Sequence, residues 1–394
     1  MFSLLYQNIS KIHMRSAILS LLFVFSFFQT AKSFAETPKA VKGLWIVRDI
    51  LRSKADIQKM LADAEKAHIT DLFVQVRGRA DAYYRSDFVP LADGLDGSFD
   101  PLEYLLAKSS GRFRVHAWVN VFYLWSAETD PSSKEHLLFT RPYWTSVSNT
   151  GISMTAQGLK SLKEKNKEGY FISPGNDDFR EYFLKVIDEI VSRYRIDGIH
   201  LDYIRYAGAE YDYAESMRAK FILTYHSDPL KMVSQDHLDR KSRWFENAWS
   251  DFRRKELSVF VSRIRSQIHT KHPNVRLSAA VWADIDMAKN ELFQDWTEWV
   301  RQGYIDLAVP MNYATDNKVF EKRIKDAQSA LPDSIFTTKI IMGISIYNQS
   351  SIAMNEKIDI CRKYGMKGLS FFSYESVRKD RAYFQEMAEA VYRQ

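Results

Sequence analysis

Residues 197–206 read DGIHLDYIRY, and this segment has the pattern of a buried β-strand that ends in a carboxylate. Because side chains alternate along a strand, His200 and Asp202 share one face, and the aliphatic side chains at 199 and 201 share the other. Asp202 falls near the carboxyl end of the strand. A buried carboxylate is costly without a partner or a role, so Asp202 is the first candidate for chemistry. The alternative is an ion pair with Arg205 or Arg77 at the rim of a sheet.

Seven further segments share this strand-like composition, and amphipathic segments with a helical period lie between them. The eight predicted strands are residues 43–48, 71–77, 114–122, 197–204, 275–282, 305–313, 339–346 and 367–374. Strands that alternate with helices predict an α/β fold, here a (β/α)8 TIM barrel. The alternative is a doubly wound open sheet, but no Gly-rich phosphate loop follows the first strand.

Two connections are too long for simple strand-to-helix loops. They are residues 123–178, after the third strand, and residues 205–254, after the fourth. Both are rich in Tyr and Trp, and both are expected on the face where barrels of this kind carry their active sites. Neither contains a repeat or a Pro/Gly-rich linker, so we expect one domain over residues 36–394.

The first 35 residues have the features of a signal peptide. Lys11 and Arg15 precede an apolar run at 17–28, and residues 33–35 (SFA) supply small side chains before a cleavage site. The run is short for a membrane span, which takes about 20 apolar residues. We therefore expect export to the periplasm or the medium, without stable membrane insertion after cleavage. The alternative is an uncleaved anchor.

The composition is that of a folded globular protein, with 46% hydrophobic and 26% charged residues. The formal charge is +6, from 55 basic and 49 acidic residues, and half of this excess lies in residues 1–35. Charges of both signs are scattered through the rest of the chain, which argues against a nucleic-acid partner. Cys361 is the single cysteine. It lies on the apolar face of a predicted helix, so we expect a buried structural thiol.

Polar and aromatic side chains gather at the carboxyl ends of the predicted strands. Amides and carboxylates hydrogen-bond sugar hydroxyls, and aromatic faces stack on the C–H faces of sugar rings, so the expected ligand is a carbohydrate. The expected substrate-binding residues are Arg77, Trp118, Asn120, His200, Tyr203, Arg205, Trp282, Asn312, Tyr313 and Tyr374.

Metal chemistry is poorly supported by the sequence. A metal-dependent barrel hydrolase usually carries a His-x-His pair on its first strand, and residues 43–48 contain no His. The remaining possible ligand set is His116, His200 and Asp202. We expect no metal and no cofactor.

Together these segments resemble the bacterial glycosyl-hydrolase-like family 10, a group of (β/α)8-barrel proteins. The matching pieces, in the family's order, are KGLWIVRD, LFVQVRGRADAYYRS, FDPLEYLL, VHAWVN, FISPGNDDFREYF, SRYRIDGIHLDYIRY, WSDFRR, VRLSAAVW, GYIDLAVPMNYA and GLSFFSYES. They cover residues 41–375. The resemblance implies action on glycan strands, with some members linked to the bacterial cell wall. It gives Asp202 the position of the nucleophile in related barrel glycosidases. Many members have a second Asp at the next position, where this chain has Tyr203.

Glycoside hydrolysis requires two carboxyl groups, one to protonate the leaving oxygen and one to attack or to activate water. We expect Asp202 to be the attacking nucleophile or base. The candidates for the acid are Glu375, Asp284 and Asp49, in that order. Glu375 ranks first because its aromatic surroundings could raise the pKa of its carboxyl group. Asp284 also fits the N-cap of a helix. The carboxylate separation, and with it retention or inversion, stays open.

Three functions fit these features. The first is an exported glycoside hydrolase that acts on a polysaccharide, for which peptidoglycan glycan is the favoured substrate. The second is a glycan-binding barrel without catalytic activity, which Tyr203 and the lack of a clear second acid support. The third is a metal-dependent hydrolase or deacetylase.

Overall fold

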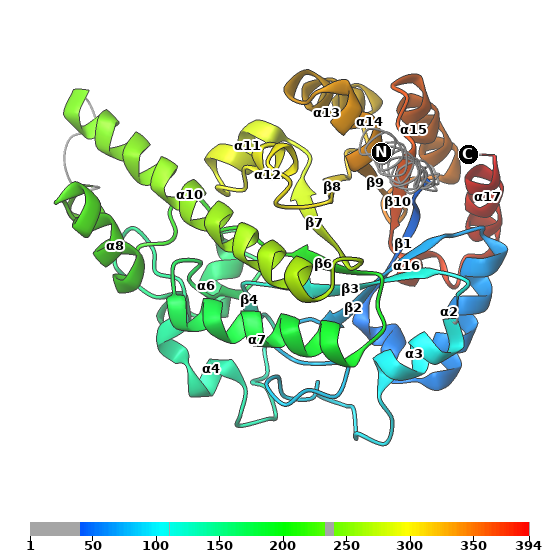
Figure 1. Ribbon diagram of the computed structural model, residues 1–394, viewed down its shortest axis with the longest axis horizontal. Helices are drawn as coiled ribbons and strands as arrows, with labels where there is room; N and C mark the ends of the chain where they lie inside the picture. The colour runs from blue at the N-terminus through cyan, green and yellow to red at the C-terminus, as the bar shows by residue number, and fades with distance from the viewer. Residues whose placement is uncertain (1–39, 110, 233–239, 394) are drawn as a thin grey trace, which may run out of the picture. The chain divides into compact units, whose positions relative to one another are not determined.

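The computed structural model describes residues 40–109, 111–232 and 240–393, and residues from Val41 onward form one compact unit. Its centre is a closed barrel of eight parallel strands, which confirms the expected fold (Figure 1). The strands are β1 (Lys42–Ile46), β2 (Asp71–Arg77), β3 (Arg114–Asn120), β6 (Gly198–Asp202), β7 (Arg276–Trp282), β8 (Leu307–Asn312), β9 (Ile341–Ser345) and β10 (Gly368–Phe372). The bounds of each strand lie within two residues of those of a predicted segment.

The barrel forms because these strands are apolar on both faces. Around the ring their order is β1-β10-β9-β8-β7-β6-β3-β2, so each strand pairs with its neighbours in the chain. The pairing of β3 with β6 sets Asn120 opposite Asp202 at the carboxyl ends of both strands. At the other end Gly198 lies opposite His116, whose ring leaves no room for a Cβ at position 198. This register brings the polar residues of both strands to one mouth of the barrel.

Helices cover the outside of the barrel. The long ones are α2 (Lys54–Lys66), α3 (Pro101–Ser109), α7 (Asp177–Arg193), α10 (Arg240–Lys271), α13 (Asn317–Ala330), α15 (Ser351–Lys363) and α17 (Arg381–Tyr392), with the shorter α11 (Ile285–Asn290), α12 (Trp296–Arg301), α14 (Asp333–Lys339) and α16 (Tyr374–Val377). Asn176 caps α7, whose Phe179 and Phe183 are fully buried. Trp296 and Trp299 pack in the core, and Cys361 is a buried free thiol on α15, as expected.

The two long connections form small elements of their own on the carboxyl-terminal face. The first contains a two-stranded sheet of β4 (Tyr123–Trp125) and β5 (Tyr170–Phe171), with α4 (Leu137–Thr140), η2 (Pro142–Trp144), α5 (Met154–Gln157) and α6 (Leu159–Glu164). The second contains α8 (Glu215–Tyr225) and α9 (Pro229–Met232). A third long connection, residues 78–100 after β2, was not expected as such. The 3-10 helix η1 (Arg48–Arg52) follows β1 directly.

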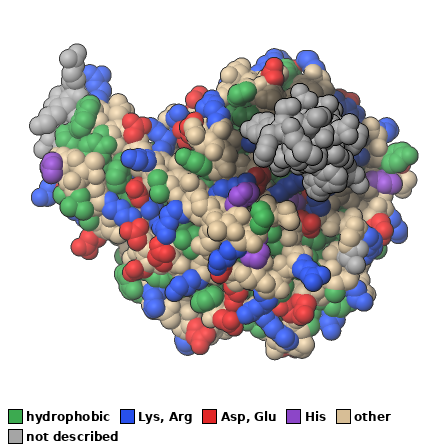
Figure 2. Space-filling model, in the orientation of Figure 1, with side chains coloured by type: hydrophobic (Ala, Val, Ile, Leu, Met, Phe, Trp, Pro, Cys, Tyr) green, Lys and Arg blue, Asp and Glu red, His purple; other side chains and the backbone are tan. Residues whose placement is uncertain are grey.

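The predicted signal peptide, residues 1–35, lies outside the described residues. In the part that is described, no helix has both the length and the apolar composition for a membrane span. Basic and acidic side chains are interspersed over the face of the molecule in Figure 2. That face therefore carries no continuous basic surface of the kind that nucleic-acid binding requires.

Polar groups also lie at the amino-terminal end of the barrel. Asp71, at the start of β2, accepts hydrogen bonds from His116 (3.0 Å) and from Arg114 Nε (2.7 Å), and it is fully buried. Burial acts to raise the pKa of Asp71, but the bonds from His116 and Arg114 outweigh it and lower the pKa to about 2. These contacts tie β2 to β3 far from the mouth.

We predict that Asp71→Asn lowers the free energy of unfolding at pH 7 by about 2–3 kcal/mol, because a drop of about two pKa units corresponds to that energy. A lowered carboxyl pKa stabilises the fold above about pH 4, and this contribution is lost as the pH falls toward 2. The wild-type advantage over the variant should shrink over the same range in urea titrations. Asp359→Asn, at an exposed ion pair with Arg362, serves as control and should change stability by less than about 0.5 kcal/mol. Equal stability of Asp71→Asn and wild type at pH 7 would contradict the lowered pKa and the stabilising role of the Asp71 carboxylate.

Candidate active site

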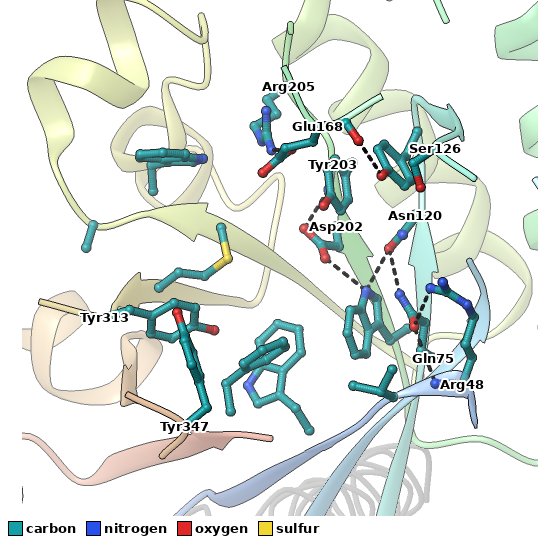
Figure 3. Close-up of a pocket in the computed structure, with 18 of the residues that line it drawn as sticks. Arg48, Gln75, Asn120, Ser126, Glu168, Asp202, Tyr203, Arg205, Tyr313 and Tyr347 are labelled. Carbon is teal, nitrogen blue, oxygen red and sulfur yellow. Dashed lines mark hydrogen bonds and ion pairs between the residues drawn. The ribbon is translucent and has the colours of Figure 1, made fainter. Parts of the chain in front are cut away.

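A cavity of about 630 Å³ opens at the carboxyl ends of the strands, where (β/α)8 barrels carry their sites (Figure 3). Every barrel strand except β9 contributes at least one of its own residues, and Tyr347 follows β9 by two positions. The walls combine arginines, amides, carboxyls and aromatic rings. The lining residues are Trp45, Val47, Arg48, Gln75, Trp118, Asn120, Tyr123, Ser126, Glu168, Asp202, Tyr203, Arg205, Trp282, Ala283, Asp284, Met311, Tyr313, Ala314, Arg323, Tyr347 and Phe372.

Asp202 is the most buried carboxyl group of this cavity, with 7% of the residue exposed. Its Oδ1 accepts the backbone N–H of Tyr203 at 2.6 Å, and its Oδ2 accepts Nε1–H of Trp118 at 3.1 Å. Burial raises the pKa of Asp202 to about 6, although both of these hydrogen bonds act to lower it. The carboxyl group is therefore held in a fixed orientation and titrates close to neutral pH.

A chain of hydrogen bonds runs from Asp202 across the mouth to β1. Trp118 Nε1 also donates to Asn120 Oδ1 at 2.9 Å, and Gln75 Nε2 lies 3.5 Å from the same oxygen. Gln75 Oε1 in turn accepts from Nη1 of Arg48 at 3.2 Å. Figure 3 shows this row of side chains on one side of Asp202. Residues from four strand ends are thus linked in one network.

Glu168 supplies a second carboxyl group from the long connection after β3. It forms an ion pair with Arg205 at 2.6 Å, and about half of its side chain is exposed. Its charge acts on Asp202, where it raises the pKa together with burial, the larger cause. Besides Asp284, the cavity thus holds one buried carboxyl group and one that is ion-paired and open to solvent.

Tyr203 lies between these two groups. Its backbone has φ of +50°, a strained conformation for a residue other than glycine, and its ring stacks on Tyr123 with centroids 4.3 Å apart. The guanidinium of Arg205 lies 4.8 Å from the same ring. The backbone turn directs the Tyr203 N–H at Asp202, so the strain serves the orientation of the carboxyl group.

The opposite side of the cavity is aromatic. Tyr313 stacks on Phe372 with centroids 5.4 Å apart, and Tyr347 packs against both at 6.1 Å. Just over half of Tyr347 is exposed. Flat, partly exposed rings facing polar groups across a cavity form a surface on which a sugar ring can stack.

Eight of the residues selected from the sequence line the cavity together. They are Asp202, Asp284, Trp118, Asn120, Tyr203, Arg205, Trp282 and Tyr313. Asp284 also caps α11, where its Oδ1 accepts the Met287 N–H at 3.1 Å, the alternative noted for it above.

Three of the proposed acids or binding residues do not line the cavity. Glu375 lies on α16 and pairs with Arg378 at 2.9 Å, so the first candidate for the acid does not line the cavity. Asp49 pairs with Arg52 at 3.1 Å on η1 and is mostly exposed. The Tyr374 hydroxyl donates to Asp63 of α2 at 2.8 Å. These positions lie after the strand ends, where strand alternation no longer decides the direction of a side chain.

Three further expectations were wrong because of strand geometry. A register shift between Gln75 and Arg77 turns Arg77 outward to the backbone of Asn120 and the ring of Phe183, so Gln75 takes the inward position. Asn312 follows the inward Met311, and its amide donates to the Phe320 carbonyl of α13. His200 does face inward, but below the cavity, where its Nδ1 contacts Ser278 at 2.8 Å.

Sequence reasoning missed several lining residues, above all Glu168 and Tyr347, and it noted Arg48 at the end of the first strand without selecting it for the site. Tyr347 follows β9 closely, so the strand-end rule that selected Asn120 would have found it. Glu168 lies deep within a connection that has no regular pattern.

The described residues contain no group of three or more His, Cys, Asp or Glu side chains placed to hold a metal ion. The three candidate ligands do not converge: His116 bonds Asp71 and His200 contacts Ser278, both below Asp202.

A family model described as glycosyl hydrolase-like 10 matches residues 40–362. Glycosyl hydrolase YngK of Bacillus subtilis (strain 168) is 23% identical over 320 residues, which cover 71% of this chain and 55% of that protein. Glycosyl hydrolase DigH of Escherichia coli (strain K12) is 24% identical over 284 residues, which cover 67% and 58%. The match thus spans little more than half the length of these curated relatives.

Among solved structures, the PgaB (BpsB) glycoside hydrolase domain from Bordetella bronchiseptica superposes with a TM-score of 0.67 at 12% identity, over 89% of this chain and 98% of that chain. A β-galactosidase from Rahnella sp. R3 superposes with a TM-score of 0.62 at 10% identity, over 91% and 56%. At these identities the likeness concerns the fold alone.

We predict that Asp202→Asn becomes more stable relative to wild type as the pH rises from about 4 to 7.5, by about 2–3 kcal/mol. A carboxyl group whose pKa is raised by folding stabilises the protein below its unfolded pKa, and this contribution is lost as the pH rises through the folded value of about 6. The amide side chain of the variant cannot ionise, so the variant does not lose this stability as the pH rises. Urea titrations of both proteins at several pH values measure the difference. A difference that does not change with pH would contradict the raised pKa.

Proposed function

The chain belongs to the glycosyl hydrolase-like 10 family, and on this basis we propose that it is a glycoside hydrolase that cleaves a polysaccharide, namely peptidoglycan glycan strands. The observation that carries the proposal is Asp202, a buried carboxyl group in a fixed orientation at the base of a cavity lined by aromatic and amide side chains. A carboxyl group of this kind is expensive to keep in a fold unless it acts on a ligand.

We propose that Asp202 is the general acid, which reverses the role expected from the sequence. A general acid must carry a proton near the working pH, and burial raises the pKa of Asp202 to about 6. The second carboxyl group is Glu168, which lines the same cavity, is more exposed and has its charge balanced by Arg205. In this assignment Asp202 protonates the leaving oxygen, and Glu168 attacks the sugar carbon or activates a water molecule.

The remaining lining residues suit a chain of sugars. Tyr313, Phe372 and Tyr347 offer stacking surfaces on one side of Asp202, and Asn120 and Gln75 offer amides on the other. A saccharide that crosses the cavity would contact both sides, with the bond to be cleaved near Asp202. The aromatic side would hold sugar rings by their C–H faces, and the amides would hold their hydroxyls.

We also propose that the protein acts outside the cytoplasm, in the periplasm or the medium. This part rests on the sequence of residues 1–35 and on the cell-wall location of the proposed substrate. Cell fractionation with antibody detection, beside a variant that lacks residues 2–35, tests it. Detection of the full-length protein in the cytosol would contradict it.

We predict that Asp202→Asn and Glu168→Gln each lower kcat/KM on glycan strands by about 100- to 10,000-fold, as expected when an acid or base is removed. Glu375→Gln, the matched control outside the cavity, should stay within about threefold of wild type. Strands with and without stem peptides are the substrates, and mass spectrometry identifies the products. Binding of the strands by wild type without any cleavage would support the glycan-binding barrel instead. Loss of activity in Glu375→Gln but not in Glu168→Gln would contradict the choice of Glu168.

We predict that kcat/KM falls about tenfold per pH unit above pH 6, because an acid must be protonated to act. Trp118→Phe removes an N–H donor that favours the ionised carboxylate, so the pKa of Asp202 should rise in the variant. The falling limb of the pH profile of kcat/KM should therefore shift to higher pH. A merely structural role of Trp118 would lower activity without moving the limb. If activity instead falls below pH 6 and persists above it, Asp202 acts as the base or nucleophile.

A further inference from the structure

Arg48 is a cation of the cavity without an acidic partner. No carboxylate of the described residues lies within 4.0 Å of its guanidinium group. Its Nη1 donates to the neutral Gln75 amide oxygen at 3.2 Å, and its Nε is buried without a hydrogen-bond partner. A guanidinium that is partly buried and unpaired is costly, and an anion that enters the cavity would offset this cost.

The surroundings of Arg48 add positive charge. Arg79 lies over the ring of Trp125 at 4.5 Å, and its Nε is likewise buried without a partner. Burial raises the pKa of Tyr123 in the cavity wall, and the charges of Arg48 and Arg79 both act against that rise, so both guanidinium groups reach this wall electrostatically.

Of the acidic residues near Arg48, Asp49 is paired with a cation, whereas no cation of the described residues lies within 4.0 Å of Asp81. Asp49 pairs with Arg52 at 3.1 Å, and Asp81 accepts the backbone N–H of Arg79 at 2.7 Å. Glu168 is paired with Arg205 at 2.6 Å. The two guanidinium groups of Arg48 and Arg79 therefore still exceed the single carboxylate, Asp81, that no described cation pairs with on this side of the cavity.

From this arrangement we propose that the cavity selects a glycan with a carboxylate-bearing sugar, and that Arg48 is the residue that binds the carboxylate. This inference rests on the proposed function and names its substrate class. Arg48 is linked through Gln75, Asn120 and Trp118 to Asp202, so its position is fixed relative to the group that acts on the glycosidic bond. The anionic group is then held at a fixed offset from the bond to be cleaved.

The chemistry of the side chain supports a carboxylate over a hydroxyl group. The planar guanidinium fork matches the two oxygens of a carboxylate, and such charge-assisted hydrogen bonds are about twice as strong as neutral ones. Tyr123 and Ser126 line the same cavity. A neutral sugar would leave the charge of Arg48 uncompensated when it displaces water from the cavity.

Arg323 is the second lining arginine without an acidic partner within 4.0 Å among the described residues, and it serves as the matched control. It lies on α13, and its Nη1 contacts Asn312 Oδ1 at 3.3 Å. It is not part of the network that reaches Asp202. Replacement of either arginine by Gln removes one positive charge from the same cavity.

The experiment compares peptide-free peptidoglycan strands, whose lactyl carboxylates are free, with the same strands after carbodiimide coupling to methylamine, which converts each carboxylate to a neutral amide. We expect wild-type kcat/KM to fall about 10- to 100-fold on amidation, the range for a lost hydrogen bond to a charged group. In Arg48→Gln the ratio of kcat/KM on the charged strands to kcat/KM on the amidated strands should fall close to one. Arg323→Gln should keep the wild-type ratio. Arg48→Lys retains the charge without the fork and should recover part of the ratio.

Equal cleavage of both forms by wild type overturns this inference and leaves the proposed function standing. So does a ratio that is lost in Arg323→Gln but kept in Arg48→Gln. If neither form is cut, titration of Asp202→Asn with both forms decides: tighter binding of the charged form supports Arg48 recognition in a glycan-binding barrel, and no binding overturns both proposals. Thermal melts establish that the variants are folded, and the wild-type comparison of the two substrates needs no variant.

Discussion

The buried carboxyl group of Asp202 is the constraint on which the rest of the site depends. It is buried because β6 lies within a closed barrel, and it keeps its orientation because two N–H donors, from Trp118 and from the Tyr203 backbone, converge on it. The donor from β3 is in place because the register of β3 and β6 sets Asn120 opposite Asp202. The donor from Tyr203 requires a backbone turn with positive φ. The strand register and this strained turn therefore both support one side chain.

Polar groups lie at both ends of the barrel and have opposite effects on stability. At the amino-terminal end Asp71 is matched by Arg114 and His116, and its lowered pKa shows that the fold favours its charge. At the mouth no cation of the described residues lies within 4.0 Å of Asp202, and burial raises its pKa. The fold gains stability from the first group and loses stability near neutral pH because of the second. In barrel enzymes the amino-terminal end commonly contributes to stability, whereas the carboxyl-terminal end carries the active site and lowers stability.

The cavity combines two kinds of wall that suit different parts of a saccharide. The aromatic wall of Tyr313, Tyr347 and Phe372 offers apolar faces, and the wall with Arg48, Gln75 and Asn120 offers donors and one unpaired positive charge. Asp202 lies between them, and Glu168 with Arg205 lies beside it (Figure 3). A ligand that is apolar on its ring faces and anionic at one substituent matches this distribution better than a neutral or a fully polar one.

The sequence by itself determined the eight strands, their alternation with helices and the position of Asp202, because a strand buried on both faces has a local signature of β-branched and aromatic residues. Alternation along the third strand also placed Trp118 and Asn120 on one face. Tyr203 is adjacent to Asp202 and reaches the same cavity only through its positive-φ turn. Only the tertiary structure decided which residues just beyond the strands reach the cavity: a register shift turned Arg77 outward, and helix contacts took Glu375 and Tyr374 away. Glu168 comes from a long connection whose path is set by packing against the barrel and not by any local period. The raised pKa of Asp202 likewise depends on burial by distant segments, and a local sequence pattern does not contain that information.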